Sequence, residues 1–346
     1  MSTAPVRAAM VPVTRRMRAY FAPVNRANET AAVFDPGKYG LFALDQPPAP
    51  WIDLGWIDNF QRFCATVSEP IRAGLKGAPS GQLHGPVDAR VEFDFREWGK
   101  LQMALAGGSE HMNVLASDPN AAAQASGGTP LAATAVLAGS SASEIVVGAG
   151  AVDAFAAGDV VAVEVDYQQQ TGYVGSGIAA AYVSDPADVN RDANYVRRVT
   201  FNVGRVAEKT TTSLLLAQPL LGGVPAAGAA VQKVIAFVDR EGGSFYQEWS
   251  GLFVAEEESG GRVCFHYPRL SPTVSIQSSI RLNLNTTSQV GSARVFQREE
   301  DVEVAKPVAA IALRAAFLAL AYTDANDGQT VVCYRSYFPA KMAGVY

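Results

Sequence analysis

The residue types that most often perform chemistry are scarce and scattered in this chain. Histidine occurs at three distant positions: His84, His111 and His266. The sequence contains no HExxH motif, no Gly-x-Ser-x-Gly elbow and no Walker A loop, which are signatures of zinc proteases, α/β-hydrolases and nucleotide-binding proteins. It therefore predicts no catalytic residue, no cofactor-binding residue and no metal ligand, and we expect a protein that is not an enzyme.

The cysteines are as isolated as the histidines. They number three and lie at Cys64, Cys264 and Cys333. Because the number is odd and no CxxC pair occurs, the sequence supports neither a zinc knuckle nor a disulfide framework. We expect free thiols in a reducing compartment.

Two acidic arrangements invite a functional interpretation. Asp53 and Asp58 lie among tryptophans, and two carboxylates beside aromatic rings are typical of carbohydrate-active hydrolases. Their odd spacing in an apparent strand should place them on opposite faces, which disfavours that alternative. The loop that begins at Asp324 resembles a calcium loop, but Gly328 comes one position early and Arg335 replaces the final glutamate. We therefore expect a turn there.

Composition and charge restrict the function further. The chain has 346 residues, of which 49% are hydrophobic, and it carries a net charge of −5. Such a composition is ordinary for a folded globular protein. No basic cluster for gripping nucleic acid is present, and no apolar run reaches the roughly 18 residues that a membrane span requires. The mild negative charge suits a surface past which DNA slides without binding.

Short alternating segments dominate the sequence and predict a mainly β fold. Residues 1–50 contain several Pro-based turn signals, so we expect an extended N-terminal arm. Alternating apolar positions predict strands at 51–67 and 87–95, with a loop at 74–86 between them. Within the first strand, Gly55 should mark a bulge or a close backbone approach.

A short helix is expected after these strands. Residues 97–105 supply its apolar surface, and the glycine pair at 107–108 should end it. The Ala/Ser/Gly-rich stretch 116–143 has the composition of a linker. Residues 308–322 are interpreted as a strand, with an Ala-rich helix as the alternative.

The residue pattern changes in the middle of the chain. Residues 144–238 contain many short β segments separated by Gly, Asp and Pro turns, which favours a small sandwich or barrel. We interpret this segment as an inserted β domain. The first domain would then be discontinuous, consisting of residues 51–130 and 239–346.

Three stretches, taken in order, resemble the major tail tube proteins of tailed bacteriophages. They are Trp51–Phe60, Val91–Gly108 and Phe317–Pro339. The resemblance implies a β-sandwich domain with a flanking helix that forms hexameric rings, stacked around a channel for DNA passage during genome ejection. It implies no cofactor and no catalytic residue. The extra segment 144–238 departs from a minimal tube subunit and leaves room for a related role.

The resemblance also implies which partners the chain would have, because a tail tube is an assembly of many subunits. The main partner would be the chain itself, with sheath, baseplate or tail terminator proteins as further partners, in a virion tail assembled in the host cytoplasm. DNA would pass through without specific binding, and no membrane would be involved. We expect the contacts in residues 20–50, 74–86 and 116–143. The candidate interface residues are Phe34, Tyr39, Trp51, Trp56, Leu83 and His84.

Two other functions stay open at this point. The chain could be another virion ring component, such as a baseplate or distal tail protein, or a capsid decoration protein. It could also be a carbohydrate-active hydrolase that uses the carboxylates and tryptophans described above. Isolated closed rings would identify the former, and a sugar-binding cleft the latter.

Overall fold

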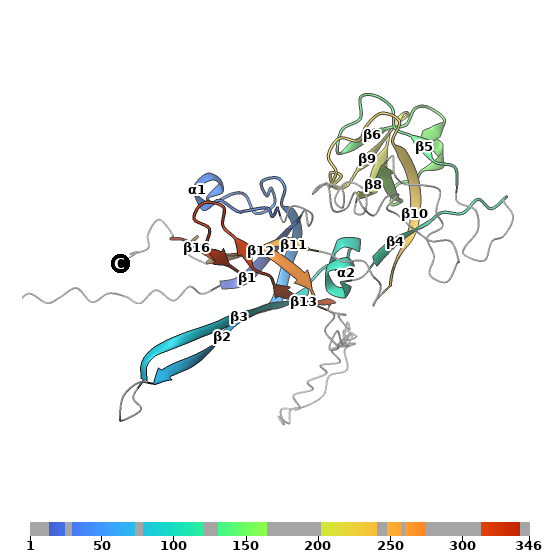
Figure 1. Ribbon diagram of the computed structural model, residues 1–346. Coiled ribbons are helices and arrows are strands. Elements are labelled where there is room, and N and C mark those ends of the chain that lie inside the picture. Colours follow the sequence, from blue (N-terminus) through green and yellow to red (C-terminus); the bar gives the residue numbers. More distant parts are fainter. Residues whose placement is uncertain are drawn as a thin grey trace, which may run out of the picture.

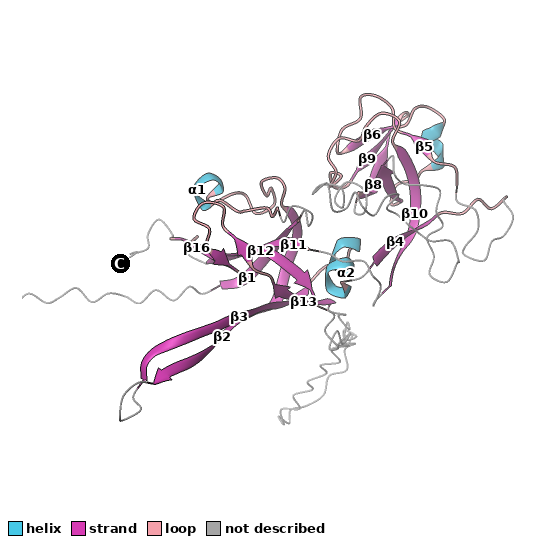
Figure 2. Ribbon diagram, in the orientation of Figure 1, coloured by secondary structure: helices cyan, strands magenta, loops and turns pink. Residues whose placement is uncertain are grey.

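The computed structural model describes residues 14–24, 30–72, 79–108, 110–120, 131–164, 202–240, 248–257, 260–273 and 313–339. Within these ranges the chain is mainly β, as the alternating patterns predicted (Figures 1 and 2). Two large sheets and a small two-stranded one contain all the described strands.

The first large sheet closes on itself as a six-stranded barrel. Its strands pair antiparallel in the order β11-β1-β2-β3-β13-β12, and β11 also pairs with β12, which completes the ring. A seventh strand, β16, pairs with β12. The strands are β1 (Thr14–Pro23), β2 (Ile52–Arg72), β3 (Pro79–Phe95), β11 (Trp249–Glu257), β12 (Arg262–Pro272), β13 (Leu313–Ala319) and β16 (Tyr334–Phe338).

Aromatic rings fill the barrel. The side chains of Phe21, Phe93, Phe253 and Phe317 are buried in one cluster. The rings of Phe93 and Phe317 stack with centroids 5.7 Å apart and an interplanar angle of 14°. Such ring pairs add about 0.5–1.5 kcal/mol each beyond the burial of their area. The barrel interior is therefore a packed core.

A second buried cluster lies on the outside of the barrel, because the side chains of β1 alternate between its two faces. Phe21 points inward, whereas Tyr20 and Ala22 belong to the outer cluster. Residues 30–50, here called the cover segment, lie over this outer face and contribute Phe34. The segment contains the short helix α1 (Pro36–Tyr39), whose first amides donate to the side chain of Asp35.

The helix α2 (Lys100–Gly107) follows the barrel strand β3 and leads to the second large sheet. This sheet has the order β4-β10-β7-β8-β9-β6, and β5 pairs with β10. It encloses its own apolar core, which includes Val161, Leu214 and Val231. Its elements are β4 (Glu110–Leu115), β5 (Thr134–Ala135), β6 (Glu144–Val146), η1 (Ala151–Ala154), β7 (Val160–Glu164), β8 (Val203–Lys209), β9 (Ser213–Leu216) and β10 (Ala230–Arg240).

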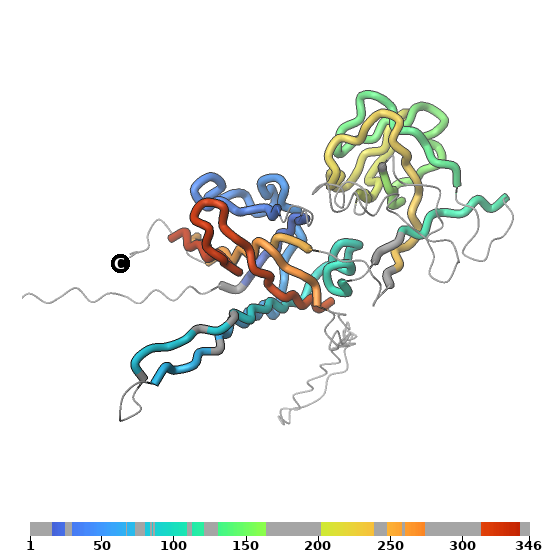
Figure 3. Tube along the Cα trace, viewed as in Figure 1, coloured from blue at the N-terminus to red at the C-terminus, as the bar shows by residue number. Residues whose placement is uncertain are grey.

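The hairpin of β2 and β3 extends far beyond the barrel (Figure 3). Within the described residues, β1 pairs with β2 no further than Ile57, and β13 pairs with β3 no further than Arg90. Beyond these points β2 and β3 pair only with each other. We call this two-stranded part, residues 61–72 and 79–89, the distal ribbon.

Three expectations from the sequence need correction. Residues 14–23 are not part of an extended arm, since β1 is a buried barrel strand in which Tyr20 and Phe21 have no exposed surface. Residues 79–86 are not loop but strand, because pairing with β2 satisfies their backbone groups despite their Gly and Pro content. Residues 110–115 form β4, which pairs with β10 in the second sheet and not with the barrel.

Other local predictions are confirmed. A helix does follow β3, and its C-cap is Gly108 in the left-handed conformation. The strand interpretation is correct for residues 313–319, which form β13. Residues 308–312 lie outside the described residues, and 320–321 are not in a strand. The loop after Asp324 is a turn between the short strands β14 (Tyr322–Thr323) and β15 (Thr330–Val331).

Candidate assembly surface

A glycine bulge sets the direction of β2 as it leaves the barrel. Gly55 has a φ of +82°, and the register between β1 and β2 shifts at this point. Glycine adopts such an angle without the steric cost that a Cβ brings. The bulge predicted from the sequence is therefore present. It explains why Leu54 and Ile57, three positions apart, are both buried.

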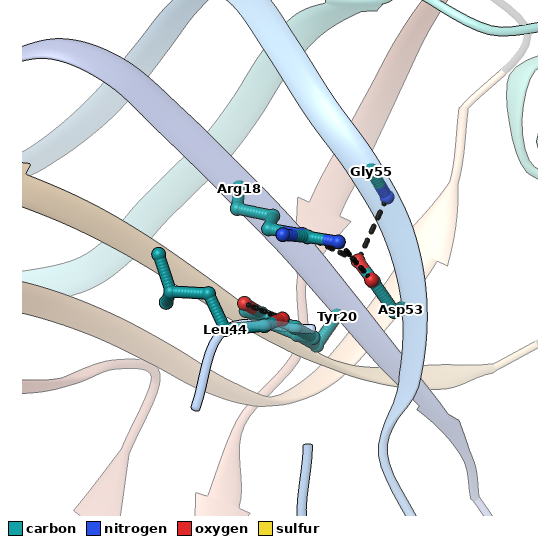
Figure 4. Close-up of polar contacts among 5 residues, drawn as sticks. All are labelled: Arg18, Tyr20, Leu44, Asp53 and Gly55. Carbon is teal, nitrogen blue, oxygen red and sulfur yellow. Dashed lines mark hydrogen bonds and ion pairs between the residues drawn. The ribbon is translucent and has the colours of Figure 1, made fainter. Parts of the chain in front are cut away.

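The carboxylate of Asp53 holds this bulge in place (Figure 4). Its Oδ1 accepts hydrogen bonds from the backbone N–H of Gly55 at 2.9 Å and from Nε of Arg18 at 2.9 Å. Arg18 Nη2 donates to Asp53 Oδ2 as well, which makes the pair bidentate. Burial opposes the charge of Arg18, but its bond to Asp53 raises the pKa of the guanidinium overall. The guanidinium of Arg18 therefore stays charged.

Tyr20 ties the cover segment to the same region. Its hydroxyl donates to the carbonyl oxygen of Leu44 at 2.8 Å (Figure 4). Burial of the ring, with the nearby charge of Asp53, raises the pKa of this hydroxyl, so it stays a donor. Trp56 lies under the guanidinium of Arg18, with 5.3 Å between the ring centroid and Cζ. These contacts hold β1, β2 and the cover segment together on this side of the barrel.

The root of the distal ribbon is clamped by a second charged cluster. Asp94 accepts from Nε and Nη2 of Arg314 at 2.7 and 3.1 Å, and from Nδ2 of Asn59 at 2.6 Å. Asn59 has a positive φ of 53° at a second register shift between β2 and β3. These bonds join β2, β3 and β13 at the point where the ribbon leaves the barrel.

The outer face of the distal ribbon carries exposed apolar side chains. Phe63 and Ile71 occupy alternate positions of β2 that share a face, and Leu83 is paired with Glu69 on that same face. Their side chains are 53%, 52% and 60% exposed. Charges of both signs lie among them, including the ion pair of Asp88 with Arg90. The ribbon thus presents an apolar stripe with mixed charge.

The structure separates the six predicted interface residues. Leu83 lies on the exposed stripe, and the backbone of His84 pairs with Ser68 in the ribbon, while its side chain lies outside the described ones. Trp56 and Tyr39 are half-buried. Phe34, from the cover segment, and Trp51, which follows it, are both buried in the outer cluster, so they belong to the core of the chain and not to its surface.

Sequence reasoning missed Phe63 and Ile71 as surface residues. Both continue the alternating pattern of a strand that starts inside the barrel, and the same pattern describes a residue that faces a core. A signal was available in the content of polar and proline residues between 61 and 72, which is unusual for a central strand.

The two carboxylates considered for a sugar site are each paired with an arginine. Asp53 is paired with Arg18, and Asp58 accepts two bonds from Arg96 at 2.7 and 2.6 Å. Trp51 and Trp249 are buried. Across the described part of the chain, no group of three or more His, Cys, Asp or Glu side chains is arranged to hold a metal ion.

The described histidine side chain and the three cysteines show no arrangement of neighbouring catalytic groups. The imidazole of His266 is buried between Trp51 and Tyr334, and burial lowers its pKa to about 4. Cys264 is buried, Cys333 is half-buried and Cys64 is exposed on the ribbon, all as free thiols.

Among the described residues, no helix is both long and apolar enough to cross a bilayer.

Comparison with known proteins leaves the chain without an identified family: no family model and no curated protein matches it.

Proposed function

We propose that this protein is a structural subunit that assembles with copies of itself, and that the distal ribbon is its docking element. The observation that carries the proposal is the ribbon itself. A two-stranded ribbon is only marginally stable alone in water, and unpaired strand edges are templates for pairing with another chain. The ribbon has both features, together with the exposed stripe of Phe63, Ile71 and Leu83.

A second copy of the chain is the occupant that fits best. The barrel strands from β11 round to β12 are mutually paired, so among the described strands of this sheet the uncovered edges belong to the ribbon and to the five-residue strand β16, and those of the ribbon are the longer. The ribbon exposes charges of both signs, with Glu69 and Asp88 negative and Arg72 positive, which allows one copy to complement another. Pairing around a symmetry axis would leave each copy with the same contacts.

The specific form that we propose is a tail tube. Rings of the chain, hexameric by the resemblance described above, would stack into a hollow tube through which DNA passes. The barrel would form the rigid wall of the tube. The bonds of Asp53 at the Gly55 bulge and of Asp94 at the ribbon root would hold the ribbon at a fixed angle to that wall. The net charge of −5 supports a lumen that does not retain DNA. A single baseplate-type ring is the second candidate.

Electron microscopy over a concentration series, combined with analytical ultracentrifugation, tests the proposal. Hollow tubes of stacked rings support it, isolated closed rings favour the baseplate candidate, and a monomer at every concentration overturns both. The double variant Phe63→Ser and Leu83→Ser should shift the assembly to higher protein concentration by tenfold or more, which corresponds to about 1.4 kcal/mol. Val224→Ser is the control, because Val224 is 68% exposed but lies far from the ribbon in sequence, in the loop between β9 and β10 of the other sheet.

A further inference from the structure

An amine and a carboxamide meet in a buried site beside α2. Lys100 is the first residue of that helix and Asn113 lies in β4, and each is only 4% exposed. Nζ of Lys100 donates a hydrogen bond to Oδ1 of Asn113 at 2.7 Å. The carboxamide carbon, Cγ of Asn113, is covalently bonded to this oxygen, so the amine is adjacent to the carbonyl group that it could attack. The two groups are therefore positioned for more than a hydrogen bond.

The third member of the site is an aromatic ring. Phe237 of β10 pairs directly with Asn113 across the β4–β10 ladder. Nζ of Lys100 lies 5.7 Å from the centroid of this ring. α2 contacts β12 and β13 of the barrel and also β4 and β10 of the second sheet (Figure 1). The site thus lies where the two sheets are connected.

Burial prepares the amine as a nucleophile. It lowers the pKa of Lys100 from 10.5 to about 7, because the charged form loses its hydration in the apolar site. Near pH 7 a large fraction of the molecules then carries Lys100 as the neutral amine, whose nitrogen lone pair can attack a carbonyl carbon. A lysine made neutral by desolvation is a recognised nucleophile towards carbonyl carbon.

The carboxamide is prepared for the loss of its nitrogen. Its oxygen accepts the bond from Lys100, whereas Nδ2 of Asn113 has no hydrogen-bond partner among the described residues. An unsatisfied buried donor destabilises the folded chain, because it loses its hydrogen bonds to water without replacement. Release of this nitrogen removes that destabilisation, and the buried position keeps out the water that would otherwise compete for the carbonyl carbon.

We propose that Lys100 and Asn113 form an intramolecular isopeptide bond. The lone pair of Nζ attacks Cγ of Asn113, and a new Nζ–Cγ bond forms. The Cγ–Nδ2 bond breaks, a proton passes from Nζ to the departing nitrogen, and one molecule of ammonia leaves. No electron is transferred and no other reactant is consumed. The bond would join α2 covalently to β4 and so connect barrel and second sheet at a fixed point.

Intact mass spectrometry of the full chain tests the inference, because a hydrogen bond leaves the mass unchanged whereas the isopeptide bond lowers it by one ammonia. The expected result for the protein purified at neutral pH is this deficit. The Lys100→Arg variant supplies the reference, since it shares any processing of the termini and lacks the nucleophile. A wild-type mass equal to the unmodified sequence, after prolonged incubation at mildly alkaline pH, overturns the inference.

Peptide mapping identifies the atoms. A protease digest should contain one branched peptide that joins the segments around Lys100 and Asn113, and it should be absent from Asn113→Leu. Lys233 is the internal control, because its Nζ lies 2.8 Å from a carboxylate oxygen of Asp159 in a more exposed site. A linear peptide with an unmodified Lys100 in the wild type contradicts the inference. The outcome is independent of assembly, because both measurements use the denatured chain.

Discussion

Nε2 of His266 lies 3.1 Å from the carbonyl oxygen of Ala32, and this contact attaches the cover segment to the barrel strand β12. The imidazole is 2% exposed, and its ring stacks on Tyr334 with centroids 5.5 Å apart. Tyr334 stays neutral, because burial and its bond to Asp324 raise its pKa. The packing therefore favours the neutral imidazole of His266 over the charged one.

Stability should fall as the pH is lowered from about 6.5 to about 4. Burial lowers the pKa of His266 from 6.5 to about 4, so in this window the unfolded chain binds a proton that the folded chain does not. The free energy of unfolding then decreases by up to about 3 kcal/mol, in addition to the loss from carboxylates. Urea unfolding across the window measures it. His266→Phe should show a shallower slope, and equal slopes would contradict the assignment.

Removal of Asp94 should destabilise the root of the ribbon. Asp94→Ala leaves Arg314 without its bidentate partner and Asn59 without its acceptor. The loss of one member of a buried pair costs about 3 kcal/mol. The control is Asp88→Ala, whose partner Arg90 is 60% exposed, and which should change stability by no more than about 0.5 kcal/mol. Equal effects in chemical denaturation would show that the root is not clamped.

A side chain at Gly55 should strain the bulge. Gly55→Ala places a Cβ on a backbone with a φ of +82°, which costs about 1–2 kcal/mol. The space itself is sufficient, since the nearest atom to the added Cβ would be 3.6 Å away on Glu97. Gly81→Ala in the ribbon is the control, because no positive φ is required there. Thermal unfolding should show a clear decrease for the first variant and less than half of it for the second.

Substitutions of two phenylalanines on the neighbouring strands β2 and β3 should affect different properties, one the stability of the monomer and the other its assembly. Phe93 is fully buried and packs on Phe317 and Phe253, so Phe93→Ala should cost about 3–5 kcal/mol of unfolding free energy. Phe63→Ala, on the exposed stripe, should leave the unfolding of the monomer within about 0.5 kcal/mol. It should nevertheless weaken assembly in ultracentrifugation. A large loss of monomer stability in Phe63→Ala would place this residue in the core instead.

The sequence by itself determined the features that depend on near neighbours. Alternating apolar residues identified β2 and the later part of β3, because the two-residue period of a strand can be recognised in consecutive positions. For β13 the turn that follows it favoured a strand over an Ala-rich helix. The bulge at Gly55 and the glycine end of α2 were predictable for a similar reason, since each depends on the freedom of a single residue. The mainly β class follows from these local signals.

The tertiary structure alone decided which residues meet. β1 reads as irregular sequence and becomes a strand only because β2 and β11 pair with both its edges. Phe34 and Leu83 are both apolar residues beside turn signals, yet one is buried and the other exposed, since burial depends on what covers a position. Lys100 and Asn113 carry no motif, and only the packing of α2 against β4 brings their side chains together. Such contacts join distant or differently oriented segments, and no local pattern encodes them.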